Sequence, residues 1–519
     1  MKRVLLAVLA VLVVTAPLGL AGVTVAQPGV QQDSKPAGPA ELRMPARKQQ
    51  APVPALLQSR ANEIYNTTCA ACHGTTAQPG PSAPALFAEG FLSSHSDAQI
   101  VQVLSDGLPN TPNHSFKTMY FPDELAQMPA LLRIRGGIVN RHVGPVPDID
   151  GKVFQSQKGS FKAQTLAKGF DQPWGMAFLP DGRLIFTERA GRIRFLNKDG
   201  SVSEPVKGTP SVFVRQDGGM LDIALHPDFA KNGWIYLSYT TVPPGYQVQP
   251  GDDTAPNMSP LTMTYIVRGK INANNEWVDQ QILFNPPADS YRVSADHYGS
   301  RFLFDHKGHF FWSMGERHDM QMSQNLASPL GKIHRLNDDG SIPKDNPFVT
   351  TPGALGSIWT FGHRNPEGLS FDPATGIFWE TEHGPVGGDE VNIIEPGKNY
   401  GWGMATFGLE PGIGRLHATG VTDPITFYNP SIGPSGITFY TGNKFPGWKG
   451  NLFITGMVGE KLIRMDIKDR QIVSQEVLVQ NYGRVRDVQM GPDGLLYLLL
   501  QNRNGDEKGG SIVRLVPAN

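Results

Sequence analysis

The sequence predicts a mostly β protein, a six-bladed β-propeller preceded by a small all-α domain. Its 58 glycines and 43 prolines are spread along all 519 residues in short clusters, which favours many short strands joined by turns over long helices. From about residue 153 onward, apolar residues form short alternating runs, and one turn pattern returns at intervals. Helical spacing is concentrated earlier, between residues 60 and 137.

The N-terminus has the pattern of a secretory signal peptide over residues 1–26. Met1-Lys2-Arg3 precedes an apolar run from Val4 to Val14 and a small-residue stretch ending near Ala26. The run is too short and too close to the N-terminus for a membrane span, so we expect a periplasmic or secreted protein without a stable span after signal removal. Residues 27–59, rich in Pro, Ala and Gln, are expected to form a flexible spacer. The 46 basic and 47 acidic residues nearly balance, which argues against a nucleic-acid partner.

The helical segment, residues 60–137, contains the run Cys69-Ala70-Ala71-Cys72-His73, and these are the only two cysteines of the chain. A C-x-x-C-H run attaches a haem through two thioethers, and its histidine becomes an axial iron ligand. A redox disulfide or half a zinc site is the alternative, but no second cysteine pair completes a metal cage. The segment resembles a small class I cytochrome c, which implies one covalent haem c.

The second axial ligand of that haem has two candidates in the loop before the last helix. Cytochromes of this class normally use methionine, which favours Met119, whereas the position relative to Asp123 favours His114. Met128 lies within the predicted helix, where core packing explains it better. We expect Met119 and retain His114 as the alternative.

After a linker at residues 138–160, the region 161–519 repeats a turn followed by a short apolar strand. Six such units predict six blades of four strands each around an axis. A β-sandwich can contain similar turns, but the length and regular recurrence favour the propeller. The turns are Pro180-Asp181-Gly182, Pro227-Asp228, Asp305 to Gly308, Asp372-Pro373, Pro446-Gly447 and Pro492-Asp493-Gly494.

Five further stretches of this region carry a specific resemblance. In order, they are GMLDIALHPDF (Gly219 to Phe229), GHRNPEGL (Gly362 to Leu369), EHGPVGGDEVN (Glu382 to Asn392), NYGW (Asn399 to Trp402) and GRVRDVQMGPDG (Gly483 to Gly494). From about Gly169 to Val516 the chain resembles the soluble glucose and aldose (sorbosone) dehydrogenases that use pyrroloquinoline quinone (PQQ). This family has six-bladed propellers, although one scaffold can carry different activities.

The resemblance implies a base and a set of cofactor contacts. His297 matches the family's catalytic base, and an imidazole that titrates near neutrality suits proton abstraction. Taken alone, a buried histidine is more often satisfied by a backbone hydrogen bond, and paired arginines on a strand can form a solvated edge. The matched positions for contacts to the quinone oxygens and the cofactor's carboxylates are Arg364, Asn365, Arg484 and Arg486, with Asp296 and Arg317 as further cofactor contacts.

The resemblance also implies calcium. The carbonyls of Gly384 and Pro385 match ligands of a Ca²⁺ on the cofactor, and Asp389, Glu390 and the Tyr400 carbonyl match a structural Ca²⁺ site. Hard oxygen donors select calcium. Capping of a loop is the alternative role for Asp389 and Glu390.

Two positions depart from the family pattern. Val458 stands where a cofactor-contacting lysine is usual, with Lys461 a few residues later, and Glu367 replaces a glutamine. A negative charge near an anionic cofactor is unfavourable unless calcium or arginine offsets it, and Arg317 is one candidate for that role. These changes argue against glucose itself as the substrate.

Together these features predict a periplasmic quinohemoprotein dehydrogenase for an aldose or related sugar. Electrons would run from the sugar to the quinone, then to the tethered haem and on to an external acceptor, because a tether raises the effective concentration of the haem. Two other classes remain open: a non-catalytic electron-transfer protein whose propeller only binds a ligand, and a calcium-dependent lactonase-type hydrolase.

Overall fold

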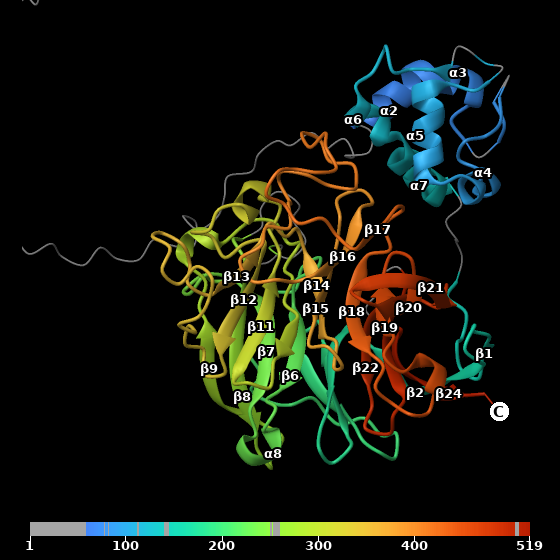
Figure 1. Ribbon diagram of the computed structural model, residues 1–519. Helices are drawn as coiled ribbons and strands as arrows, with labels where there is room; N and C mark the ends of the chain where they lie inside the picture. Colours follow the sequence, from blue (N-terminus) through green and yellow to red (C-terminus); the bar gives the residue numbers. More distant parts are fainter. Residues whose placement is uncertain are drawn as a thin grey trace, which may run out of the picture.

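The computed structural model describes residues 59–76, 78–80, 83–109, 111, 114–139, 145–249, 252, 260–503 and 508–518. The predicted signal peptide and almost all of the predicted spacer lie outside these ranges. Two parts are visible, a helical domain and a larger β domain (Figure 1). None of the helices in the described ranges combines the length and the apolar character needed to cross a bilayer.

The elements of residues 60–139 are short helices whose starts follow from local capping. The Ser59 hydroxyl accepts the Asn62 N–H, and Ser96 forms a capping box with Gln99. Pro122 occupies the first turn of its helix, where its missing N–H costs nothing. The helices are α2 (Arg60–Ile64), η2 (Tyr65–Cys69), α3 (Ala70–His73), α4 (Glu89–Ser94), α5 (Asp97–Asp106), α6 (Pro122–Ala126) and α7 (Met128–Val139).

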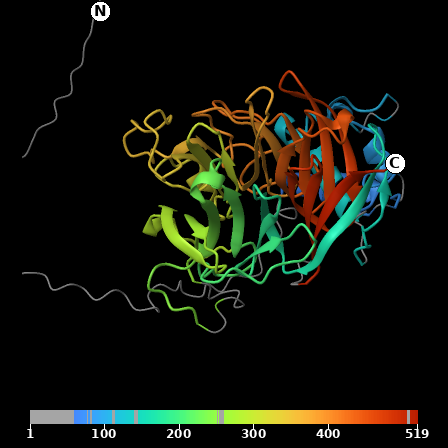
Figure 2. The same cartoon turned by 90° about the horizontal axis from the view of Figure 1, so that it is seen from below.

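The β domain is a ring of six antiparallel sheets (Figure 2), which confirms the predicted six-bladed propeller. The first sheet contains β3 (Pro173–Phe178), β4 (Leu184–Glu188) and β5 (Arg192–Leu196). The second contains β6 (Met220–Leu225), β7 (Ile235–Thr241), β8 (Met263–Ile271) and β9 (Trp277–Phe284). The third contains β10 (Phe302–Phe304), β11 (His309–Met314), β12 (Lys332–Asn337) and β13 (Ile358–Phe361).

The other three sheets complete the ring. The fourth sheet contains β14 (Pro366–Phe371), β15 (Phe378–Glu382), β16 (Asp389–Ile393) and β17 (Thr426–Tyr428). The fifth contains β18 (Pro434–Phe439), β19 (Leu452–Gly456), β20 (Lys461–Lys468) and β21 (Gln471–Gln480). The sixth contains, in spatial order, β1 (Val153–Phe154), β2 (Phe161–Phe170), β24 (Gly510–Pro517), β23 (Leu496–Gln501) and β22 (Arg484–Met490). Short helical turns lie between strands: α8 (Phe229–Asn232), η4 (Ala288–Ser290), η5 (Met320–Ser323) and η6 (Pro446–Trp448).

Each predicted turn lies between the first and second strands of a sheet, for example Pro180-Asp181-Gly182 between β3 and β4. Gly182 and Gly494 have φ values of +86° and +77°, in the left-handed region that glycine adopts without strain. Because antiparallel strands alternate in direction, these turns share one face of the ring. The connections between sheets, and those between second and third strands, therefore emerge on the opposite face.

The last sheet closes the ring by combining strands from the two ends of the β domain. β2 pairs with β24 from Phe161 opposite Pro517 to Phe170 opposite Gly510. The two-residue strand β1 adds to β2, so the segment expected to be a linker contributes an edge strand to the propeller.

Arg301 precedes β10 at the axis of the ring, and its guanidinium contacts the innermost strand region of each of the other five sheets. Its Nη1 lies 3.1 Å from Asp222 Oδ1 and 3.3 Å from Asp487 Oδ1. Its other contacts are the Glu367 carbonyl at 2.8 Å, the Ser435 hydroxyl at 3.4 Å and the Trp174 ring, whose centre is 4.5 Å from Cζ. We call this group the axial arginine cluster.

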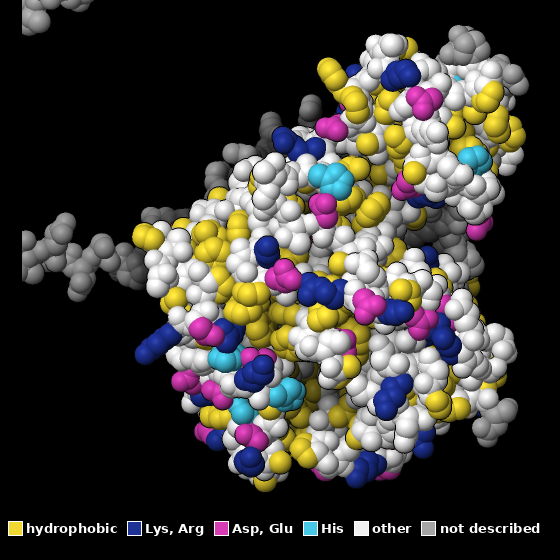
Figure 3. Space-filling view, in the orientation of Figure 1, with side chains coloured by type: hydrophobic (Ala, Val, Ile, Leu, Met, Phe, Trp, Pro, Cys, Tyr) yellow, Lys and Arg dark blue, Asp and Glu magenta, His cyan; other side chains and the backbone are white. Residues whose placement is uncertain are grey.

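The helical domain stands over one side of the propeller (Figures 1 and 3) and touches it through α7. Leu409 of the propeller is buried in the same apolar cluster as Leu131 and Ile134, and Val386 packs against that cluster. The fit at Gly387 is close, since a Cβ there would lie 2.8 Å from Ile134 Cδ1. The helical domain therefore rests on the loop between β15 and β16.

Candidate active site

The predicted quinone-site residues lie on or near one face of the propeller, opposite the repeated turns. His297 lies between β9 and β10, and Arg364 lies between β13 and β14. Arg484 and Arg486 lie at the start of β22, and the 383–388 loop joins β15 to β16. The fold thus brings together loops and strand ends from several sheets around the axis.

His297 is buried and is oriented by a carboxylate. Its Nδ1 lies 2.5 Å from Glu316 Oε1, and its ring stacks on His318 with 4.1 Å between ring centres. Because a carboxylate accepts hydrogen bonds, Nδ1 carries the proton and Nε2 keeps a free lone pair. Burial, followed by the Arg364 charge, holds the pKa of His297 well below its ordinary value of 6.5. The imidazole is therefore a neutral base held in one tautomer.

The backbone around this dyad is unusual. His297 has a φ of +56° and Arg317 a φ of +60°, in the left-handed region that non-glycine residues seldom occupy. Gly315 passes so close that a Cβ on it would lie 2.1 Å from the His297 carbonyl oxygen. Such strain persists only where the surroundings enforce it, and it is common at functional sites.

Arg364 and Asn365 follow each other but are fixed differently. The Arg364 backbone N–H donates to Glu382 Oε2 at 2.6 Å, while its guanidinium lies over the Trp402 ring, 5.2 Å from the ring centre. Its buried Nε has no hydrogen-bond partner among the described residues. Asn365 is engaged at both ends, since Oδ1 accepts the Gly299 N–H and Nδ2 donates to Glu367.

Glu367, the residue that departs from the family pattern, is neutralised within the protein. Arg486 Nη1 donates to its Oε2 at 2.6 Å, and His383 Nε2 lies 3.7 Å from the same oxygen. Although burial favours the protonated acid, Arg486 and His383 lower the pKa of Glu367 to about 2. The offsetting charge thus comes from Arg486, with its own buried Nε unpartnered among the described residues.

Arg317 is placed elsewhere. Its fully buried guanidinium donates to the carbonyls of Asp296 and Thr262 at 3.0 Å and to that of Ser294, and it covers the Tyr298 ring. These contacts hold the 294–298 backbone, so Arg317 supports the His297 loop and does not face Glu367. The Asp296 carboxylate pairs with His318 at 3.2 Å.

The expected lysine position is occupied by an exposed apolar side chain. Val458 is 44% exposed, and burial lowers the pKa of Lys461. Both line a groove of about 640 Å³ beside Ile134 and Gly137 of the helical domain. Arg484 is half-buried, and its Nη2 donates to Met457 Sδ at 3.8 Å.

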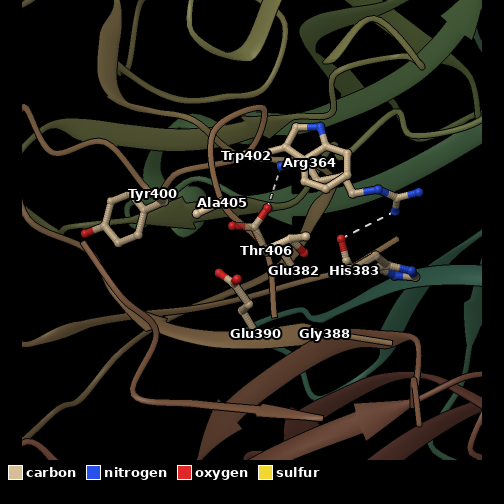
Figure 4. A pocket seen from close by; sticks show the side chains of 10 residues that line it. Arg364, Glu382, His383, Gly388, Glu390, Tyr400, Trp402, Ala405 and Thr406 are labelled. Atoms are coloured by element: carbon tan, nitrogen blue, oxygen red, sulfur yellow. Dashed lines mark hydrogen bonds between the residues drawn. The ribbon is translucent and has the colours of Figure 1, made fainter. Parts of the chain in front are cut away.

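A cluster of carboxylates lies between β15 and β16 (Figure 4). Figure 4 shows two of its members, Glu382 and Glu390. Glu382 is directly opposite Glu390 in the strand register, and Glu380 is opposite Asn392. The single Asn392 amide donates to Glu380 at 3.0 Å and to Glu390 at 3.2 Å. Burial and the Glu382 charge raise the pKa values of Glu380 and Glu390 well above normal.

The same cluster borders a space of about 10 Å³, room for one small ion, lined by Glu382, Glu390, Tyr400 and Thr406. Like charges opposite each other on paired strands destabilise a sheet, and a divalent cation held by oxygen ligands removes that repulsion. Glu390 and Tyr400, predicted as calcium ligands, are thus brought together with Glu382.

Asp389 has a different environment from Glu390. Its Oδ2 accepts from Ser431 Oγ and from the N–H groups of Ile432 and Gly433, and its Oδ1 accepts the Gly384 N–H at 2.9 Å. The carboxylate therefore ties the Gly384–Pro385 turn to the segment before β18. In this arrangement it positions the Gly384 and Pro385 carbonyls and fits the loop-anchoring alternative.

In the helical domain, the C-x-x-C-H run lies on η2 and α3. Cys69 is buried and Cys72 exposed, and both are free thiols. His73 Nδ1 lies 2.8 Å from the Pro84 carbonyl oxygen, so that its Nε2 remains for another partner. The candidates for the second ligand differ in exposure: His114 is half-buried, whereas 63% of the Met119 surface is exposed.

Sequence reasoning missed Glu316, Glu382 and His383, which the structure places next to predicted residues. For Glu382, the alternation of Glu380 and Glu382 along one strand was a usable signal, since both then face the same side. Glu316 could not be assigned to His297 because 18 residues separate them and their pairing depends on the close approach of Gly315 to the His297 backbone.

Comparison with known proteins places the β domain in a family. The family model for glucose/sorbosone dehydrogenases matches residues 170–514. The aldose sugar dehydrogenase YliI of Escherichia coli is 35% identical over 366 residues, which cover 69% of this chain and 93% of that protein.

Two solved structures agree with this match. The soluble aldose sugar dehydrogenase of Escherichia coli in its apo form has a TM-score of 0.62 at 32% identity and is covered completely by 69% of this chain. The PQQ-bound aldose sugar dehydrogenase of Streptomyces coelicolor has a TM-score of 0.55 at 26% identity, over 71% of this chain and 99% of that one. The helical domain lies outside the matched range, and the chain belongs through residues 170–514 to the glucose/sorbosone dehydrogenase family.

Proposed function

We propose that the protein is an exported quinohemoprotein that oxidises an aldose or related sugar with PQQ and passes the electrons to a covalent haem c. The observation that carries this proposal is the neutral, carboxylate-oriented His297 beside Arg364, in a chain of a family whose PQQ-bound member is an aldose sugar dehydrogenase. A C-x-x-C-H motif on the adjoining domain supplies the haem attachment.

In this reaction His297 Nε2 takes the proton of the sugar hydroxyl, and Glu316 stabilises the resulting imidazolium through Nδ1. Removal of that proton prepares the adjacent C–H bond for transfer of its electron pair. The chemistry that PQQ would supply at this site is two-electron oxidation. Arg364 would provide positive charge at the quinone oxygens, where negative charge develops.

The donor set fits an anionic quinone. Arg364 and Arg486 each present a buried Nε without a partner among the described residues, and Arg484 adds a third cation. Planar guanidinium groups suit carboxylates and keep their charge when buried. These arginines would hold the cofactor.

The oxygen-rich cluster fits calcium. Glu382, Glu390 and the Tyr400 carbonyl would hold one ion, and the Gly384 and Pro385 carbonyls would hold another at the cofactor. Calcium there supplies Lewis-acid polarisation of a carbonyl. Asp389 fixes the turn that presents the two carbonyls.

The helical domain fits covalent haem. Its two free thiols, the imidazole oriented by Pro84 and an apolar cluster around Cys69 match the needs of the group. Haem supplies one-electron transfer to an external acceptor. Helix α7 rests on the loop that carries Gly384 and Pro385. The domain that would carry the haem therefore contacts the loop that would hold calcium at the quinone.

The test is a spectrum of the full-length protein, purified after export and mixed with Ca²⁺ and PQQ. An aldose should reduce the haem, with no reduction when PQQ is omitted and with a reduced rate in the His297→Ala variant. A control variant, Arg514→Ala, changes a partly exposed pair with Asp493 of the β22–β23 turn, on the face opposite the predicted quinone-site residues, and should behave like wild type.

Other outcomes would overturn the proposal. PQQ binding without haem reduction by any aldose, alcohol or sugar aldehyde in a broad panel would indicate a ligand-binding propeller. Calcium-dependent opening of lactones without PQQ would indicate a hydrolase.

A further inference from the structure

The haem motif and one other histidine form a pair that the resemblance to class I cytochromes does not assign. The ring centres of His73 and His114 lie 6.1 Å apart, with an angle of 86° between the ring planes. His73 uses Nδ1 for the Pro84 carbonyl, so its remaining nitrogen is available to a ligand.

His114 has the features of a side chain awaiting a partner. Its Nδ1 is buried and has no hydrogen-bond partner among the described residues. A buried nitrogen without a hydrogen bond is unfavourable, so its presence needs an explanation.

The backbone that carries His114 is well anchored. Its N–H donates to the Thr111 carbonyl at 3.1 Å. The next residues bind the end of α5, because Ser115 Oγ donates to the Ser105 carbonyl at 2.7 Å and the Phe116 N–H donates to that of Leu104 at 2.8 Å. The backbone of His114 is thus tied to the end of α5.

The spacing of the two rings matches one metal ion between them. A metal–imidazole nitrogen bond is about 2 Å long and the ring centre lies roughly 1 Å further, which places the centres of two axial imidazoles about 6 Å apart. Perpendicular ring planes are compatible with this, since two planes that contain the same axis can have any angle between them.

Met119 is less suited to the same role in this structure. Its side chain is 63% exposed, and it lies on a turn closed by its N–H to the Phe116 carbonyl. Met128, the other methionine of the region, is 1% exposed within the apolar cluster. Met119 is thus directed mainly to solvent, and Met128 is committed to the apolar cluster.

We propose that the haem iron is ligated by two histidines, His73 and His114, with Met119 outside the coordination sphere. This inference rests on the covalent haem of the proposed function. Since methionine ligation raises the reduction potential of a cytochrome c, the chain's haem would have a lower potential than a His/Met cytochrome of similar burial.

The test uses the full-length holoprotein and its optical and paramagnetic resonance spectra. The wild-type ferric protein should be low-spin and lack the weak far-red band of methionine ligation. His114→Ala should keep its covalent haem but lose the low-spin signal, which added imidazole should restore. Met119→Ala should leave the spectra unchanged.

A matched control is His95→Ala, which removes another histidine of the same domain whose Nδ1 already contacts the Phe91 carbonyl. It should keep the wild-type spectra. A far-red band in wild type that disappears in Met119→Ala, or a low-spin signal that survives in His114→Ala without imidazole, overturns bis-histidine ligation while leaving the haem itself in place. Absence of haem colour on a denaturing gel overturns the haem proposal instead.

Discussion

At His297 the chain holds an imidazole between a carboxylate and an arginine, and this fixes how its rate should depend on pH. The base must be neutral to act, and burial and Arg364 hold its pKa below 6.5. The value of kcat/KM should therefore stay near its plateau at pH 6.5 and fall only at more acidic pH. A pH profile of sugar-dependent haem reduction measures this, and an acidic limb centred at or above 6.5 would contradict it.

Replacement of the base should separate turnover from cofactor binding. His297→Ala should lower kcat by about two to four powers of ten, because general-base catalysis acts in the transition state. PQQ affinity, measured by titration calorimetry, should change little. The Glu316→Gln variant keeps the size of the side chain and should show an intermediate loss; equal losses of kcat and PQQ affinity in His297→Ala would argue for a binding role.

For Glu367 we expect that substitution strengthens PQQ binding. Its carboxylate accepts a hydrogen bond of 2.6 Å from the Arg486 guanidinium, so part of the positive charge of Arg486 is compensated before the cofactor binds. Glu367→Gln preserves a hydrogen-bonding side chain but removes the charge, and PQQ should bind several-fold more tightly. Titration with PQQ at constant Ca²⁺ measures the change. Weaker binding in this variant would show that Glu367 positions Arg486 more than it neutralises it.

At the scale of elements, the pairing of β15 with β16 controls the carboxylate cluster. Burial and the Glu382 charge raise the pKa values of Glu380 and Glu390, so these carboxyls keep their protons to higher pH than ordinary ones, and Ca²⁺ must displace such protons. Calcium binding should therefore release protons and weaken as the pH falls. Calorimetry in buffers of different ionisation enthalpy measures the release, and Glu390→Gln should reduce it. Binding without proton release would place the ion elsewhere.

The elements also show how far the sequence could be interpreted. The six blades were predictable because each depends on a local turn, such as Pro492-Asp493-Gly494, followed directly by a strand. The meeting of Glu382 with Glu390 depends on strand register, which the hydrophobic pattern of a buried pair does not fix. The role of Asp389 was similarly hidden, because its partners Ser431 to Gly433 lie more than 40 residues away.

At the scale of the molecule, the axial arginine cluster joins all six sheets through one side chain. Arg301→Ala would leave Asp222 and Asp487 buried without their cation, and loss of one partner of a buried ion pair costs about 3 to 5 kcal/mol. Burial already raises the pKa of Asp487 to about 6 despite Arg301.

Denaturant unfolding of Arg301→Ala beside Arg514→Ala measures this cost, since the latter removes partly exposed contacts with Asp493, Tyr497 and Gln164. The Arg301 variant should lose several kcal/mol and the control less than about 1 kcal/mol. Equal losses would show that the axial contacts add little to the cohesion of the ring.

The pairing of β2 with β24 has a consequence for biogenesis. Arg514 donates to Gln164, 350 positions earlier in the chain, so during synthesis β2 can pair only with the two-residue strand β1 until β24 has been made. Contacts of such sequence separation are slow to form, and until then the β24-facing side of β2 is an unpaired strand edge. Unpaired edges are sites where chains associate, so closure of the ring is the step that removes this hazard.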